Sequence, residues 1–368
     1  MDGGCLPIVI VPRDISFEST PGCHAGSLER NATTDDNDGN SSGYPLYLSE
    51  DWDSGIGGGL WTTGLALGRY FATSPHFLEE FRSLRSSKTK HTHNQQQQQQ
   101  HEQQFTCHVA TTALNTANAP TNNRQPPIRV LELGSGNGFL GVCLVTAVAV
   151  AEANSLDKKR TDNNSNSKIN SNTDNTSEDA IDVGFDFDCW RPGIEVVVTD
   201  TAEHLPLMRA TIESNLKRIL PQIIRNHKAN TNMNTDIDID TYIDVERIAR
   251  VEEYLWGEDY NFGGGRTSNR SGDKISGHQQ STTFDLIIGS DVAYRDHLHD
   301  PLIAALDEFC VPQHTVALIG VTMSDTKPIF FEKLTERGFC YEKLADHLLG
   351  DEFCTSNRQF GVFSISKR

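Results

Sequence analysis

A twelve-residue run from Val130 to Gly141 constrains the fold of this chain more than any other segment. An apolar stretch ends in the acidic residue Glu132, glycines follow at alternate positions, and an apolar segment typical of a helix begins at once. Glycines let the backbone turn sharply and approach a ligand with no Cβ in the way. The run therefore predicts the first strand-to-helix turn of an α/β sheet, with a nucleotide-like cofactor bound there. A tight turn without a ligand is the alternative interpretation.

The spacing of the glycines indicates which cofactor the turn binds. In the dinucleotide fingerprint Gly-x-Gly-x-x-Gly, the N-terminus of the helix carries a pyrophosphate. Here the glycines are Gly134, Gly136 and Gly138, and Glu132 precedes them. An acidic side chain beside the turn would repel a pyrophosphate, but it can receive the ammonium group of a methionine moiety. The pattern therefore favours S-adenosylmethionine over NAD.

Polar, low-complexity tracts interrupt the chain. They are rich in Asn, Ser, Asp, Thr, Gly or Gln and hold too few apolar side chains to offset the entropy lost on ordering. Each tract therefore predicts a disordered or loop insertion. The tracts cover residues 24–43, 84–125, 153–180, 261–282 and, more weakly, about 225–240.

Between the tracts, the hydrophobic pattern predicts alternating strands and helices. Expected strands are Ile8–Val11, Tyr44–Leu48, Arg129–Leu133, Glu195–Asp200, Arg247–Leu255, Phe284–Gly289, Thr315–Met323, Phe339–Leu344 and Phe360–Lys367. Expected helices are Gly64–Phe81, Gly138–Ala151, Leu205–Leu220, Pro301–Phe309 and Lys327–Arg337. Repeated strand–helix units favour an α/β, Rossmann-like open sheet of about seven strands, mostly parallel, with helices on both faces. The last two strands are expected to form an antiparallel hairpin.

The predicted organisation has one core domain with long insertions, although the length alone would suit two average domains. Residues 1–83 are expected to hold the N-terminal strands and a tryptophan-containing lid and helix. Residues 84–125 are expected to form a linker, and residues 126–368 the cofactor-binding core.

Two further positions lie where ligands of such sheets bind. Asp200 ends an apolar strand, so its carboxylate can accept hydrogen bonds from both ribose hydroxyls. Its alternative role is the N-cap of the helix that begins at Leu205, and the two roles can coexist. Trp256 follows the next expected strand and can stack on adenine, or it can be an ordinary core residue.

Two more segments carry candidate functional residues. Asp291 and Tyr294 follow the strand Phe284–Gly289, so they would face the ligand crevice. Alternatively, Asp291 caps the next helix and Tyr294 packs against it. The glycine-rich segment from Gly57 to Gly64 contains Trp61 and can fold over a cofactor, or it is simply a loop before a helix.

Charge and residue usage limit the partners. The net charge is −18, and no cluster of Lys and Arg is visible, so nucleic acid is not an expected partner. An acidic surface suits a protein substrate with a basic segment. None of the eight cysteines forms a Cys-x-x-Cys pair, which favours reduced thiols in the cytoplasm, with the nucleus as a second compartment.

Other classes of site and segment are not expected. No apolar run is long enough to span a membrane, and the N-terminus does not resemble a signal peptide. The histidines do not show a metal-ligand spacing, so no metal site is predicted, and we interpret them as surface or cap residues. They are His204, His297, His299 and His314. We expect the chain to be a monomer.

Taken in order, the motifs resemble the seven-β-strand S-adenosylmethionine-dependent methyltransferases. More narrowly, they are similar to the family-16 group of protein lysine methyltransferases, over residues 44–83, 127–152, 193–220 and 247–366. The matching motifs are Gly59-Leu60-Trp61, Val130–Gly138, Thr199-Asp200, Asn215, Leu255-Trp256-Gly257 and Asp291-Val292-Ala293-Tyr294. The chain departs from the family in its insertions, in Ser290 where alanine is usual, and in Thr62-Thr63 after the tryptophan. These departures bear on substrate choice more than on cofactor binding.

The resemblance implies a role for each residue. The methionine end would be held at the turn, the ribose by Asp200 and the adenine by Trp256, while Trp61 and Ser290 would complete the pocket. Asp291 and Tyr294 would be catalytic and face the incoming amine. The residues implied at the turn are Glu132, Gly134, Ser135, Gly136 and Gly138.

The implied reaction is methyl transfer from S-adenosylmethionine to a lysine side chain of a protein. A free lysine has a pKa near 10.4, so the amine must lose a proton before it attacks. Two other classes remain open at this point: a methyltransferase for a small molecule or RNA, and an inactive binding module of the same fold. The Asn-Pro-Pro-Tyr motif typical of attack by a nucleobase amine is absent. An NAD-linked dehydrogenase is disfavoured by the glycine spacing.

Overall fold

The structure is a computed structural model and describes the parts of the chain that form the sheet, its helices and a small N-terminal hairpin. The described residues are 10–13, 44, 46–49, 61–73, 77, 126–167, 191–231, 243–258, 283–349 and 360–368. The tracts 24–43, 84–125 and 261–282 and the glycines Gly57–Gly59 lie outside the described residues. The division into residues 1–83, 84–125 and 126–368 therefore stays a prediction.

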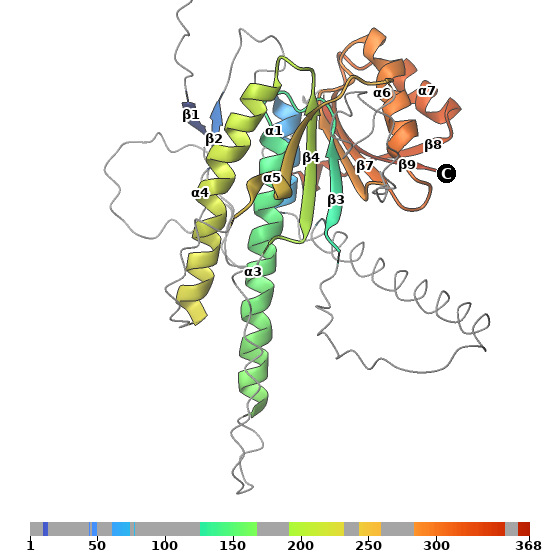
Figure 1. Cartoon of the computed structure of the whole chain (residues 1–368). Helices are drawn as coiled ribbons and strands as arrows, with labels where there is room; N and C mark the ends of the chain where they lie inside the picture. Colours follow the sequence, from blue (N-terminus) through green and yellow to red (C-terminus); the bar gives the residue numbers. More distant parts are fainter. Residues whose placement is uncertain are drawn as a thin grey trace, which may run out of the picture.

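A seven-stranded sheet forms the centre of the molecule (Figure 1). Its apolar strands are buried on both faces, as is typical of parallel sheets. All neighbouring strands are parallel except β9, which is antiparallel to both of its neighbours. Across the sheet the strands are β5 (Ala249–Glu253), β4 (Ile194–Asp200), β3 (Ile128–Glu132), β6 (Leu286–Ser290), β7 (Val316–Thr322), β9 (Phe360–Lys367) and β8 (Phe339–Lys343). The predicted fold class is confirmed, including the C-terminal antiparallel hairpin.

The strand order reverses at the middle of the sheet. From β3 the chain continues to β4 on one side, and it later returns to β6 on the other side of β3. In open α/β sheets, ligands bind outside the carboxyl ends of the strands at such a switch point. The ends of β3, β4 and β6 therefore mark the candidate site.

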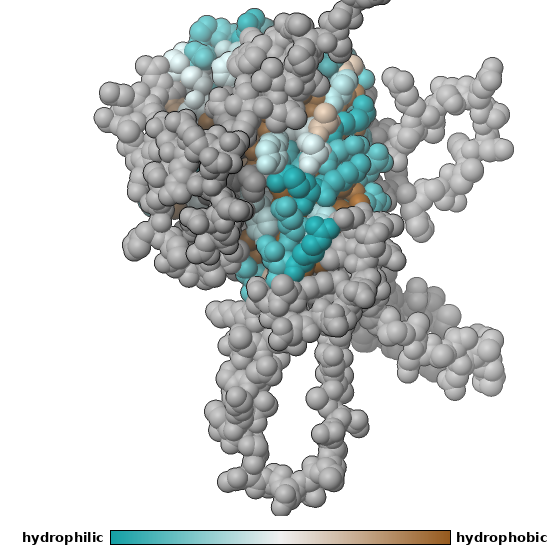
Figure 2. Space-filling model, turned by 90° about the vertical axis from the view of Figure 1, so that its left-hand side faces the viewer, coloured by the Kyte–Doolittle hydropathy of each residue, from teal (hydrophilic) through white to brown (hydrophobic). Residues whose placement is uncertain are grey.

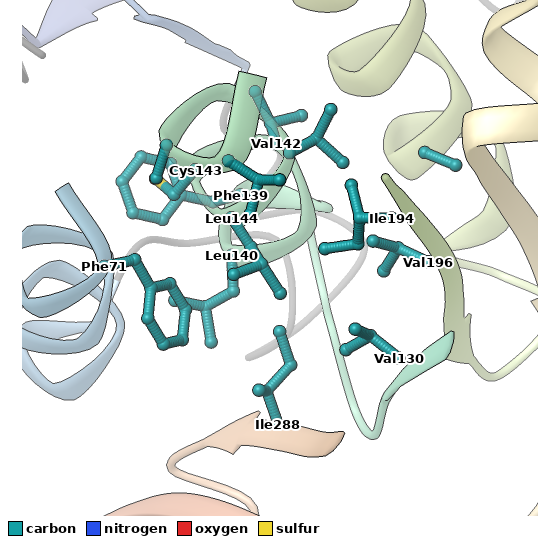
Figure 3. Close-up of a cluster of buried hydrophobic side chains, with 14 of the residues drawn as sticks. Phe71, Val130, Phe139, Leu140, Val142, Cys143, Leu144, Ile194, Val196 and Ile288 are labelled. Carbon is teal, nitrogen blue, oxygen red and sulfur yellow. The ribbon is translucent and has the colours of Figure 1, made fainter. Parts of the chain in front are cut away.

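Helices cover both faces of the sheet (Figure 1). One face carries α1 (Thr62–Thr73), α3 (Phe139–Ser167) and α4 (Leu205–Thr231), and the other carries α6 (Asp296–Phe309) and α7 (Pro328–Glu336). On the first face, Phe71 of α1 and Leu140 of α3 pack over Val130, Val196 and Ile288 of the sheet (Figure 3). This packing places the start of α1 beside the strands that carry the candidate site.

Two helices run further than the composition predicted. α3 continues to Ser167, within the tract 153–180, and α4 continues to Thr231, within the tract near 225–240. Once a helix is nucleated, extending it by one residue requires little free energy. Leu, Lys and Arg after residue 155 also favour helix. The expected strand Arg247–Leu255 is also corrected, because the short helix α5 (Val245–Ile248) precedes β5 and is capped by Asp244.

A separate antiparallel hairpin, β1 (Ile10–Arg13) with β2 (Leu46–Ser49), confirms the N-terminal strands. Asn215 of α4 fixes β2: its amide oxygen accepts the Tyr47 N–H at 2.7 Å, and its amide nitrogen donates to the Tyr47 carbonyl at 2.6 Å. Arg218 lies over the Tyr47 ring, 4.1 Å from its centroid. The face that includes α4 is mostly hydrophilic where it is described (Figure 2). No helix in the described part of the chain is both long and apolar enough to cross a membrane.

Candidate active site

The glycine-rich turn joins the end of β3 to the start of α3. Gly134, Gly136 and Gly138 have φ values of 61°, 63° and 81°, a conformation that residues with a side chain rarely adopt. A Cβ on Gly134 would lie 2.8 Å from Cζ2 of Trp256 and 2.9 Å from Cγ1 of Val292. Glycine is therefore required here both for the backbone conformation and for the close approach of the indole.

Glu132 lies on the interior side of the turn and is only 1% exposed. Its Oε1 accepts a hydrogen bond from the Ser135 hydroxyl at 2.6 Å. Burial raises the pKa of Glu132 to about 7, although the hydrogen bonds from Ser135 and from the Gly141 N–H act in the opposite direction. The structure thus places Glu132 as an internal brace of the turn rather than at the solvent-facing surface.

Asp200, at the end of β4, is tied to the same turn. Its Oδ2 accepts the Gly136 N–H at 2.7 Å, and its Oδ1 accepts the Thr201 N–H at 2.7 Å. Nδ1 of His204 also lies 2.7 Å from Oδ1. Burial opposes ionisation of Asp200, but the hydrogen bonds from His204, Gly136 and Thr201 outweigh it and lower the pKa. Asp200 does not cap α4, which begins at Leu205.

Trp256 brings the region after β5 to the turn. Its indole is half-buried, packs against the buried apolar side chains on the α6 and α7 side of the sheet, and reaches Gly134. The two interpretations of this residue are therefore compatible, because one part of the ring belongs to the core and another lines the glycine turn.

Asp291 follows β6 and has φ 52°, which is uncommon for a residue other than glycine. Its Oδ2 accepts a hydrogen bond from the Thr63 hydroxyl of α1, and its Oδ1 accepts one from the Thr322 hydroxyl of β7 at 2.5 Å. Burial raises the pKa of Asp291, the two threonine hydrogen bonds lower it in part, and the nearby Asp325 raises it. The Asp291 side chain thus lies between α1 and the sheet.

The remaining predicted residues flank Asp291. Ser290 is the half-buried last residue of β6, and Trp61, 39% exposed, immediately precedes α1. Tyr294 is half-buried, and the Arg295 guanidinium lies 5.5 Å from its ring centroid. The structure therefore gathers the predicted residues along one edge of the sheet, with Asp200 and Asp291 on opposite sides of β3.

Of two buried histidines, His204 directly precedes α4, as a cap residue does, whereas His299 lies inside α6 and was interpreted wrongly as a surface or cap residue. His204 is buried beside Asp200, and His299 is fully buried, with Nε2 located 3.1 Å from the Ala293 carbonyl. Thr326 donates to the same carbonyl at 3.0 Å. The partners of both histidines lie close in sequence, at four positions for His204 and six for His299, so the i, i+4 spacing of Asp200 and His204 is a local signal that could have indicated their contact. The described residues hold no cluster of three or more possible metal ligands.

A comparison with known protein families matches part of the chain. Residues 40–185 match the family described as lysine methyltransferase, and the matched range contains Trp61 and the glycine turn. Asp200, Trp256 and Asp291 lie beyond that range. No protein with a curated description matches the chain.

Three solved structures of methyltransferases are similar to this chain at low identity and low TM-score. An O-methyltransferase family protein from Burkholderia thailandensis has 10% identity and a TM-score of 0.32, covering 65% of this chain and 51% of that chain. A TehB-like SAM-dependent methyltransferase from Corynebacterium glutamicum has 15% identity and a TM-score of 0.29, covering 67% and 83%. A precorrin-6y C5,15-methyltransferase from Geobacter metallireducens has 10% identity and a TM-score of 0.30, covering 67% and 82%.

At these identities and TM-scores, the substrates named for the three structures are not carried over to this chain. The family match confirms the resemblance drawn from the motifs. Residues 40–185 are thus similar to the lysine methyltransferase family, and S-adenosylmethionine is the cofactor that the resemblance implies.

Proposed function

We propose that this chain transfers a methyl group from S-adenosylmethionine to a lysine side chain of a protein substrate. The observation that carries the proposal is the meeting of three features at the carboxyl edge of one sheet. These are the positive-φ glycine turn, the Asp200 carboxylate bonded to that turn, and the half-buried Asp291 carboxylate on the far side of β3. The family match of residues 40–185 supports lysine as the acceptor.

The residues at the turn fit this cofactor. Gly134 lets the Trp256 indole pack directly on the turn, which suits an aromatic platform for adenine. The hydrogen bonds to Asp200 keep its pKa low, so it is an anionic acceptor for ribose hydroxyls. Glu132 braces the turn from the interior. In our proposal the cofactor-binding residues are Trp61, Glu132, Gly134, Ser135, Gly136, Gly138, Asp200, Trp256 and Ser290.

Asp291 and Tyr294 are proposed to receive the lysine. A carboxylate oxygen can accept more than one hydrogen bond, so Asp291 retains acceptor capacity for an ammonium group beside its threonine partners. When bound, S-adenosylmethionine supplies a methyl group on a sulfonium sulfur, which a neutral amine can take. The partly buried surroundings of Asp291 favour loss of the lysine proton to water, and the Tyr294 hydroxyl orients the nitrogen.

The acidity of the chain suits a substrate with a basic segment, because the net charge is −18. Action as a monomer in the cytoplasm, or also in the nucleus, belongs to the same proposal and rests on the sequence alone.

Calorimetry with S-adenosylmethionine tests the cofactor site. Asp200→Asn should weaken binding by about 10- to 100-fold, since a hydrogen bond to a charged group contributes about 1.5–3 kcal/mol. Glu213→Gln is the matched control, because Glu213 is an exposed acid on α4 that pairs only with Lys217 among the interactions described for it. No measurable binding by the wild-type chain would instead indicate an inactive module.

The acceptor is tested by incubating a proteome extract with the chain and S-adenosylmethionine carrying a radioactive methyl group. We expect label on protein lysines, and its loss with Asp291→Ala and with Tyr294→Ala. Labelled nucleic acid or small molecules without labelled protein would refute the protein substrate. Full labelling by both variants would refute the roles given to Asp291 and Tyr294.

A further inference from the structure

Asp291 has a hydrogen-bond partner on each carboxylate oxygen, and the two partners come from distant parts of the chain. Thr63 belongs to the first turn of α1 and donates to Oδ2, whereas Thr322 ends β7 and donates to Oδ1. The Asp291 carboxylate therefore connects a helix from the N-terminal region to two adjacent strands of the sheet.

The approach of Thr63 depends on a glycine in β7. Thr63 is fully buried, and a Cβ on Gly320 would lie 2.9 Å from the Thr63 Cβ. The Gly320 carbonyl also accepts the Asp291 N–H at 2.8 Å. Gly320 thus allows α1 to lie close to the sheet and at the same time holds the Asp291 backbone.

The backbone of Asp291 is held in an unfavourable conformation. A residue other than glycine rarely adopts φ 52°, and this conformation persists only where its surroundings fix it. Besides Thr63 and Thr322, the Ala293 carbonyl is held by His299 and Thr326. The loop from Asp291 to Tyr294 is therefore fixed at both its side chain and its backbone.

We propose that Thr63 and Thr322 are positioning residues for Asp291, which direct the free lone pairs of its carboxylate toward the substrate amine and fix the start of α1 to the same point. This inference rests on the proposed lysine methyl transfer and deepens it. Because Trp61 lies two residues before Thr63, the hydrogen bond between Thr63 and Asp291 also fixes the position of Trp61 relative to Asp291. Thr63 belongs to the pair Thr62-Thr63, where this chain departs from the family pattern, and the proposal gives that departure the function of positioning Asp291.

The hydroxyl donors also set the charge state of Asp291. Burial and Asp325 oppose its ionisation, while the Thr63 and Thr322 hydroxyls favour it. Asp325 is the one charged group that acts noticeably on Asp291 among the described residues; the ammonium of Lys327 on the following segment is paired with Asp296. Removing one hydroxyl should therefore raise the pKa of Asp291.

The test uses full-length Thr63→Val and Thr322→Val, which keep the side-chain shape and remove the donor. Thr63→Ser and Thr322→Ser restore the donor. Thr73→Val is the control, because the exposed Thr73 hydroxyl donates to the Arg69 carbonyl within α1 and has no other partner among the described residues. The probe is the protein lysine identified by radioactive labelling. We expect each valine variant to lower kcat about tenfold with little change in KM, and the serine variants to recover most of it.

A second measurement separates positioning from a general loss of folding. The acid limb of the pH profile of kcat/KM should move up by about one pH unit in the valine variants and stay in place in Thr73→Val. A double-mutant cycle gives a further check. The factor by which Thr63→Val with Asp291→Asn changes the unfolding equilibrium constant should differ about tenfold from the product of the factors of the two single variants, because the two residues are in contact.

The possible failures are distinguishable. If the wild-type chain binds S-adenosylmethionine but labels no protein lysine, the proposed function is refuted, and the positioning role falls with it. If the wild-type chain is active while both valine variants match Thr73→Val in kcat and pH profile, the positioning role alone is overturned. Serine variants as impaired as the valine variants would also overturn it, since they retain the donor.

Discussion

Replacing Gly134 with alanine tests how the glycine turn is built. The substitution adds one methyl group at a position with φ 61°, where that group would lie 2.8 Å from Trp256 Cζ2 and 2.9 Å from Val292 Cγ1. Two separate penalties therefore arise: the backbone conformation is unfavourable for alanine, and the indole or the valine must move.

The structure offers a control that separates the two penalties. Gly338, after α7, has φ 84° but no atom within 4 Å of an added Cβ, so Gly338→Ala has the conformational penalty alone. That penalty is about 1–2 kcal/mol. Overpacking adds about 1–3 kcal/mol, so Gly134→Ala should lower the free energy of unfolding by about 2–5 kcal/mol.

Urea denaturation of the wild-type chain and both variants measures these differences, and calorimetry measures S-adenosylmethionine binding. Gly134→Ala should also weaken binding by at least about tenfold, because the displaced Trp256 no longer lines the turn, while Gly338→Ala should bind as the wild type does. Equal destabilisation by the two substitutions, or unchanged cofactor affinity in Gly134→Ala, would refute the close packing of Trp256 on Gly134.

Two further predictions concern other parts of the fold. Asn215→Ala removes both hydrogen bonds to the Tyr47 backbone and should lower the free energy of unfolding by about 1–3 kcal/mol; wild-type stability in urea would contradict the docking of β2. Burial raises the pKa of Glu132 from 4.5 to about 7, so between these pH values the folded state binds more protons than the unfolded state and stability falls as pH rises. Glu132 contributes about 3 kcal/mol to this fall. Glu132→Gln should therefore lose less stability than the wild type between pH 5 and pH 8, and equal losses would contradict the buried carboxyl.

Local patterns predict the part of the site that is continuous in sequence. The acid, the alternate glycines and the apolar helix start lie within a dozen residues, and Asp200 and Asp291 each follow a recognisable buried strand. The sheet topology then brings these strand ends together, as connection rules require. Cofactor-site residues could therefore be proposed before any contact was known.

The partners of those residues could not be predicted in the same way. Thr63 and Asp291 are separated by 228 positions, and no spacing or composition links them. His204 and His299 contact partners only four and six positions away, yet their burial depends on how the helices α4 and α6 pack against the sheet. The ends of α3 and α4 lie further along the chain than predicted for a different reason. Their last residues are polar, which predicts a loop, but an established helix tends to continue into such residues.

The place of β9 in the sheet has a consequence for how the chain folds during synthesis. β9 follows the other described strands in sequence, yet it lies between β7 and β8 rather than at an edge. Until residues 360–367 emerge, β7 and β8 cannot be joined, and the backbone groups that later pair with β9 stay open. Unpaired strand edges promote association with other chains. The nascent chain should therefore need protection until β9 is available, even though the glycine turn was translated much earlier.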